Sequence, residues 1–424
     1  MKQISFCHAM AALPWFSIVP SISVAALLED SSLTLTARNY YIDRDFTGDS
    51  RYSAAREWAQ GFILKGQSGY TEGPIGFGID LTASIGIKLD SSPDRAGTGL
   101  LPVSPVSRET PSEYSELAGA LKARVSKTDL QLGAIYPTLP IIWASPARLI
   151  PQYYRGVYAT SEEFTNLKIH AGWLDRVNQR DSTDFQAMSL ANPNGRYRAG
   201  ATSEKYVLAG AEYSFTPSTT IKLFHAELQD IFVQDHLGLL HSMVVGPGTL
   251  KSDLRYFNSR EAGAAKAGVI DNQNYGAMFS YQLLAHTASI GYMHQSGETG
   301  LPYLGGGEGG VLSEGAMSAD FVNPKENTLV LRYDYNFAAM GIPGLRGMLR
   351  YMRGTNIELP SLGGSDMKES AKDVEMSYVI QSGPVQGLSL RLRHAIYRND
   401  LSSAATFRSA NETRVNVDYT WKFR

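Results

Sequence analysis

Arginines spaced two residues apart are the side chains in this sequence best suited to bind a solute. In "LSLRLRHAIYR", Arg391 and Arg393 alternate with leucines, and Arg414 directly precedes the alternating end "VNVDYTWKF". A guanidinium group is always charged and matches a carboxylate through two parallel hydrogen bonds. A column of such groups along an aqueous path favours anions. The chemistry that these residues suggest is recognition of carboxylates.

The arginines lie in segments that alternate apolar and polar residues. Successive side chains of a β-strand point to opposite faces, so Leu390 and Leu392 share one face while Arg391 and Arg393 share the other. The same parity assigns further charged side chains to the polar face, namely Arg38, Arg44, Arg332, Asp334, Arg346, Arg350, Arg414 and Lys422. The elements that position the arginines are therefore expected to be strands.

The alternating segments recur along the whole chain, as in "SLTLTARNYYI", "GFGIDLTASIGIKL" and "TLVLRYDYNF". Short turns such as "TEGPIG", "TPST" and "GPVQG" alternate with long connections at 90–114, 138–152, 178–204, 296–324 and 355–370. Segments of this length and spacing are typical of a transmembrane β-barrel, with short turns at one end and long loops at the other. We predict an all-β, antiparallel barrel of about 18 strands.

Aromatic residues near strand ends, such as Tyr419, Trp421 and Phe423, favour the membrane interpretation because they match an interface girdle. The alternative is a secreted soluble β-protein, which also alternates. In a membrane barrel, a charge facing lipid near the midplane costs about 2–4 kcal/mol, so the arginines should face the lumen. Because the first and last strands of a closed barrel are neighbours, the arginines of both chain ends should form one basic wall. Alternatively, some of them pair with Asp334, Asp418 or Glu375 and only stiffen the wall.

The N-terminal segment "MKQISFCHAMAALPWFSIVPSISVA" has the basic start, apolar centre and small-residue end of a secretory signal peptide. We expect residues 1–25 to be the signal and 26–424 the barrel. Cys7, the single cysteine, would leave with the signal, so no disulfide is expected.

Other functions find little support in the residues. A net charge of -2 does not indicate nucleic-acid binding. His236 and His241 lack a recognisable metal-ligand spacing, and Gly-x-Ser-x-Gly is absent. We expect no enzyme activity, no metal and no cofactor, although a Ser-His-Asp arrangement in space stays open.

Several motifs resemble those of the OprD-like porins, which are outer-membrane carboxylate channels of Gram-negative bacteria. The similar segments run in the same order from Ser31 to Phe423: "SSLTLTARNYYIDRDF", "KTDLQLGAIYPTLP", "RLIPQYYRG", "GIPGLRGMLRYMRG" and "YVIQSGPVQGLSLRLRHAIYR". The resemblance implies a monomeric 18-stranded barrel whose third and seventh extracellular loops, here roughly 138–152 and 296–324, fold into the lumen.

The resemblance also implies which residues line the pore. Arg391, Arg393 and Arg414 match a basic ladder, and Arg44 and Arg148 match further pore positions. Tyr303 and Asp320 match residues opposite the ladder. Together with Arg350, which parity sends inward, these form the predicted substrate-binding set.

The predicted function is passive, selective diffusion of small carboxylate solutes, such as amino acids, peptides and organic or aromatic acids, across the Gram-negative outer membrane. The expected partners are outer-membrane lipid, these solutes and the assembly machinery, which commonly reads a terminal aromatic; here Arg424 follows Phe423. The alternative is a non-conducting barrel, an adhesin or hydrolase scaffold, with a plugged lumen.

Overall fold

The computed structural model describes residues 24–48 and 52–424, so most of the predicted signal peptide, residues 1–25, lies outside the described residues. The principal sheet contains 19 strands, of which β10 is a two-residue extension beside the end of β9; the other 18 form the barrel. Consecutive barrel strands pair antiparallel, as the alternation predicted. No helix of the described residues has the length and apolar character needed to cross a membrane.

The barrel strands are β1 (Ser32–Phe46), β2 (Ala54–Gln67), β3 (Gly76–Asp90), β4 (Glu113–Val125), β5 (Thr128–Ile135), β8 (Tyr153–Ser161), β9 (Leu167–Asn178), β13 (Tyr206–Thr216), β14 (Thr219–Leu228), β15 (Phe232–Val245), β16 (Gly248–Glu261), β17 (Asp271–Leu283), β18 (His286–Ser296), β19 (Asn327–Asn336), β20 (Leu345–Leu359), β21 (Gly364–Val379), β22 (Ser389–Asn399) and β23 (Ala410–Lys422). The shorter elements are α1 (Val24–Glu29), β6 (Thr138–Leu139), β7 (Ile142–Trp143), β10 (Phe185–Gln186), β11 (Met188–Ser189), η1 (Pro193–Gly195), β12 (Thr202–Ser203), η2 (Phe337–Met340) and η3 (Pro360–Leu362).

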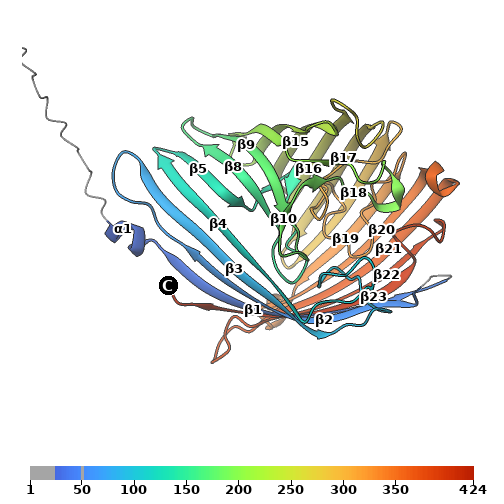
Figure 1. Ribbon diagram of the computed structural model, residues 1–424, viewed down its shortest axis with the longest axis horizontal. Helices are drawn as coiled ribbons and strands as arrows, with labels where there is room; N and C mark the ends of the chain where they lie inside the picture. The colour runs from blue at the N-terminus through green and yellow to red at the C-terminus, as the bar shows by residue number, and fades with distance from the viewer. Residues whose placement is uncertain (1–23, 49–51) are drawn as a thin grey trace, which may run out of the picture.

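The barrel closes where its first and last strands meet. β1 and β23 pair antiparallel from Thr34 opposite Lys422 to Phe46 opposite Ala410. Figure 1 shows the blue β1 and the red β23 side by side, with the other strands following around the ring. Closure gives every barrel strand a hydrogen-bonded neighbour on each side, as a membrane-spanning sheet requires.

Side-chain parity is as predicted from the sequence. On β22, Leu390 and Leu392 are 41% and 51% exposed on the outer face. On β23, Val415 and Trp421 are exposed outward, whereas the inward Arg414 is only 3% exposed. The apolar residues therefore form the membrane-facing surface, and Arg391, Arg393 and Arg414 face the lumen.

The longest connections lie at one barrel end, as predicted, but the long connection predicted at 355–370 is absent. Instead of a loop over 355–370, β20 continues to Leu359 and β21 begins at Gly364, with only η3 between them. The register of this hairpin shifts twice beyond Gly354, so the alternation breaks although pairing continues. Buried Ile357, Leu359 and Met367 hold the extended hairpin together. A long connection at 400–409, the ninth, was not predicted.

The long loops fill much of the lumen. The third loop (residues 136–152) contains the β6–β7 hairpin, and its Leu139, Ile141 and Ile142 pack inside the barrel against Tyr206 and Phe224. The seventh loop (297–326) packs through buried residues on the inner face of β16, β19 and β20. Apolar contacts thus hold both loops inside the barrel and narrow its bore.

The third, fourth (179–205) and seventh loops are also joined directly. A β-bridge links Trp143 of the third loop to Glu308 of the seventh, and another links Leu190 of the fourth to Leu304. The carbonyl oxygen of Gly305 accepts hydrogen bonds from the amides of Gln152 and Gln179, both at 3.1 Å. The three loops therefore form one connected body within the barrel.

Candidate functional site

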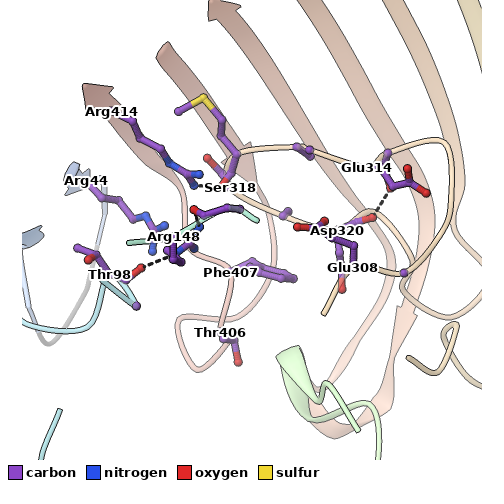
Figure 2. Close-up of a pocket in the computed structure, with 18 of the residues that line it drawn as sticks. Arg44, Thr98, Arg148, Glu308, Glu314, Ser318, Asp320, Thr406, Phe407 and Arg414 are labelled. Carbon is purple, nitrogen blue, oxygen red and sulfur yellow. Dashed lines mark hydrogen bonds between the residues drawn. The ribbon is translucent and has the colours of Figure 1, made fainter. Parts of the chain in front are cut away.

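A cavity lies between the basic wall and the inserted loops. Its volume is about 360 Å³, and it is lined by β1, β22, β23 and five of the long loops. Figure 2 shows Arg44, Arg148 and Arg414 on one side and Glu308, Glu314 and Asp320 on the other, with Phe407 between them. The cavity therefore has a basic side and an acidic side.

Six of the eight predicted site residues line this cavity, namely Arg44, Arg148, Tyr303, Asp320, Arg393 and Arg414. They come from strands at both ends of the chain and from the third and seventh loops. Barrel closure and loop insertion together bring them to one place.

A buried carboxylate engages two arginines of the basic side. Glu412 on β23 accepts from Arg44 Nε at 2.8 Å and from Arg414 Nε at 2.5 Å, and it is fully buried. Arg414 also donates to the carbonyl oxygen of Met317 in the seventh loop at 2.5 Å. Since one carboxylate offsets one of the two positive charges, Arg44 and Arg414 together carry a net charge of about +1 into the cavity.

Arg393, Arg148 and Arg180 line the same cavity without a carboxylate partner among the described residues. Arg393 donates to Tyr40 Oη at 2.7 Å and to Asn416 Oδ1 at 3.1 Å, and its Nε has no hydrogen-bond partner. Arg180, in the fourth loop, donates to Ser145 Oγ and to the Gly306 carbonyl. These three guanidinium groups are held in place by neutral acceptors, so their charges remain available to an anion.

Arg148 is positioned by backbone carbonyls from two loops. Its Nε donates to Thr98 O at 3.1 Å, and its Nη1 donates to Ala147 O at 2.9 Å. Burial, followed by the positive charges of Arg180 and Arg414, lowers the pKa of Arg148 well below the usual range of arginine. The lowered pKa expresses the free-energy cost of holding this charge without an anion, a cost that a bound carboxylate would relieve.

The acidic side is organised by an arginine that the sequence did not reveal. Arg196 of the fourth loop donates to both carboxylate oxygens of Asp320, at 2.6 and 2.7 Å, and Tyr303 Oη donates to Asp320 at 2.7 Å. Asp320 thus holds both Arg196 and the Tyr303 hydroxyl in place. The pair also fastens the fourth loop to the seventh.

Glu308 and Glu314 provide the remaining acidic groups of the cavity lining. Glu308 accepts from Ser145 Oγ at 3.1 Å. Glu314 pairs with Arg255 Nη1 at 2.7 Å, yet its burial raises its pKa to about 7. Because Glu314 titrates near neutrality, the charge of the acidic side changes with pH.

Two predicted site residues lie outside the cavity lining. Arg350 is buried on β20, where it pairs with Asp373 at 2.6 Å and donates to the carbonyls of Glu314 and Gly315. Its contacts anchor the seventh loop to the wall. Arg391, nearer the short-turn end of β22, is half exposed in the lumen and pairs with Glu375 at 2.7 Å.

The alternative that wall arginines pair along the wall is realised for several of them. Arg38 pairs with Asp418, Arg332 with Asp334 and Arg391 with Glu375. All three carboxylates had been named as possible partners from parity alone. Pairing within and between strands therefore separates arginines that stiffen the wall from those that keep an unpaired charge.

Residues 25–423 match the sequence profile described as outer membrane porin, OprD family. The chain belongs to the OprD family. It is thus an outer-membrane channel protein of the Gram-negative type rather than an enzyme.

Similar OprD-family sequences and structures agree with this assignment. The porin-like protein GalP of Pseudomonas putida is 35% identical over 97% of this chain and 98% of its own. OccAB2 of Acinetobacter baumannii is 42% identical and has a TM-score of 0.90, with 94% of this chain and 100% of that chain covered. OpdK of Pseudomonas aeruginosa, solved with vanillate, is 36% identical with a TM-score of 0.86 over the same shares of the two chains.

Proposed function

We propose that this porin carries small carboxylate solutes by passive diffusion through the cavity between the basic wall and the inserted loops. The observation that carries the proposal is the set of three guanidinium groups, on Arg148, Arg180 and Arg393, that line the cavity without a carboxylate partner in the described part of the chain. Several moderate sites in series allow a solute to enter without being trapped.

The position of the charges supports a path along the basic wall. Arg393 lies two residues from Arg391 on the same face of β22, and it lies opposite Arg414 on β23. A carboxylate that leaves the cavity toward the short-turn end therefore meets Arg391 next. Arg391 is already paired with Glu375, so it offers a weaker, shared contact. The strength of binding therefore falls along the path, which favours release.

The acidic side of the cavity favours solutes that carry a cation as well as a carboxylate. Glu308 and Glu314 face the arginines across the cavity (Figure 2). An amino acid can place its carboxylate against the guanidinium groups and its ammonium toward these carboxylates. The related OpdK was solved with vanillate, a carboxylate without an ammonium, so an aromatic acid is the other class to test.

The proposal is tested by reconstituting the purified protein in planar bilayers and in liposomes. Single-channel conductance separates an open channel from a plugged scaffold. The reversal potential in a KCl gradient should show anion preference. Liposome swelling should then be faster for amino acids and aromatic acids than for neutral sugars of equal size. Cation preference together with equal rates for acids and sugars would contradict the proposal.

We further propose that the porin works as a monomer, that residues 1–25 act as a cleaved signal and that the assembly machinery inserts the barrel. The 18 barrel strands close within one chain, which supports the monomer because no partner strand is needed to complete the bore.

The pH dependence of selectivity follows from Glu314. Its carboxyl group is mostly neutral below pH 7 and mostly charged above it, because burial raises its pKa to about 7. Between pH 6 and pH 8 the cavity gains most of one negative charge, so anion preference should fall. Reversal potentials at the two pH values measure this change, and Glu314→Gln should flatten it. An equal pH response in the variant would assign the titration to another group.

A further inference from the structure

Three exposed cations gather on the outer face of the barrel, away from the lumen. They are Arg353 on β20, Lys372 on β21 and Arg398 on β22. Ser370 of β21 pairs with Arg353 on one side and with Arg398 on the other, and Lys372 lies two residues along β21 on the same face. Since neighbouring strands are about 4.8 Å apart, the backbones of the two arginines are separated by about 10 Å.

The three cations lie at the edge of the band of apolar residues that faces the membrane. Toward the short turns, the outward residues next to them are apolar or aromatic: Tyr351 and Leu349 on β20, Val374 on β21 and Ile396 on β22. Toward the long loops the outward residues are polar. The cations therefore lie where lipid headgroups meet the barrel, and their long stems can extend toward that layer.

The charges of this patch are not neutralised within the described residues. Arg353 and Lys372 form no ion pair there, and Arg398 donates to the carbonyls of Tyr397 and Ala410 and to Asn411. Nearer the loop tip, the Asp400 carboxylate accepts from the backbone amide of Lys368.

Outward arginines elsewhere at the long-loop end have carboxylate partners. Arg56 on β2 pairs with Asp43 at 2.8 Å, and Arg260 on β16 pairs with Asp235 at 3.3 Å. The β20–β22 sector differs in that a cluster of cations faces the headgroup layer with no acid between its members.

The geometry points to a lipid site: the outer face of β20–β22 binds a membrane lipid whose headgroup carries two phosphates. Arginines bind phosphate oxygens in paired hydrogen bonds, and lysine adds a point charge. The spacing of about 10 Å between Arg353 and Arg398 lets each hold one phosphate, with Lys372 between and below them. The apolar residues below, including Leu349 and Ile396, contact the acyl chains.

Native mass spectrometry of the detergent-purified porin tests this site, with diphosphoryl lipid A as the probe. The wild type should retain the lipid, and the variant R353S/K372S/R398S should bind it at least tenfold more weakly. Fully dephosphorylated lipid A should bind the wild type as weakly as it binds the variant. Arg56→Ser, which removes one outward-facing but acid-paired cation, is the matched control for the single variants of the patch and should retain the probe.

The outcomes are distinguishable from a folding defect. Unchanged single-channel conductance of the triple variant shows an intact barrel, and Arg353→Ser or Arg398→Ser alone provides milder variants, each with weakened binding expected. Equal retention by wild type and triple variant overturns the site, as does an equal loss in Arg56→Ser. Displacement of the lipid by inorganic phosphate at the same concentration overturns the assignment to a lipid.

Discussion

Replacing Arg148 and Arg393 together with alanine should reduce carboxylate permeation by about tenfold or more. Each guanidinium contributes a charge-assisted contact worth about 1.5–3 kcal/mol, and about 1.4 kcal/mol corresponds to a factor of ten in binding. Neither residue holds a carboxylate of the described chain, so their removal leaves no protein anion unpaired. Carboxylate uptake in liposomes and the reversal potential measure the effect, which should shift selectivity toward cations.

Arg391→Ala is the matched control for Arg393→Ala alone, the single variant on the same strand. It removes the same formal charge as Arg393→Ala, but Arg391 lies outside the cavity and is already paired with Glu375. Its effect on carboxylate uptake should be several-fold smaller. Equal effects of Arg391→Ala and Arg393→Ala would mean that total lumen charge, rather than the cavity, sets permeation.

Arg350→Ala should destabilise the barrel and loosen the seventh loop at once. Arg350 and Asp373 form a buried pair whose side chains are only 3% and 1% exposed. Removing one partner of such a pair leaves a buried charge and costs about 3–5 kcal/mol. The substitution also removes the two hydrogen bonds to the carbonyls of Glu314 and Gly315. We expect a lower free energy of unfolding in urea, with larger and noisier single-channel currents.

Arg332→Ala is a suitable comparison for Arg350→Ala. Arg332 faces Arg350 across β19 and β20 and pairs with Asp334, but the pair is about a third exposed and its hydrogen bonds do not reach a loop. A substitution there should cost about 1 kcal/mol or less, because exposed ion pairs are weak. If both variants give quiet currents of wild-type size, Arg350 does not restrain the seventh loop.

The barrel was predictable from sequence because its determinants are local. A period of two, repeated in many segments, fixes which side chains face lipid and which face the lumen. It correctly placed Leu392 toward the lipid and Arg393 toward the lumen. A barrel of this many strands closes when its first and last strands pair, and this pairing brings Arg44 and Arg414 together. The same rule could also have found Glu412, which shares the parity of Arg414 two residues away. The extended β20–β21 hairpin was missed since its register shifts interrupt the period.

The loop residues of the site could not be placed in this way. Arg180 and Arg196 lie in a long connection without periodicity, so their positions depend on tertiary contacts with loops more than 100 residues away along the chain, such as Arg196 with Asp320. Arg148, Tyr303 and Asp320 were named only through family resemblance. Parity also could not tell which inward arginines have a carboxylate partner, because pairing depends on neighbouring strands as well as on the strand itself.

The bridges between Trp143 and Glu308 and between Leu190 and Leu304 have a mechanical consequence. Loops that are hydrogen-bonded to one another and packed on the wall form a constriction of fixed shape and do not move independently. Solutes passing through such a constriction are selected by its width and by the functional groups that line it, without a gating motion of the loops. Channels built this way would then acquire different substrate preferences through substitutions of the side chains that line the constriction, while the connected loops keep their backbone arrangement.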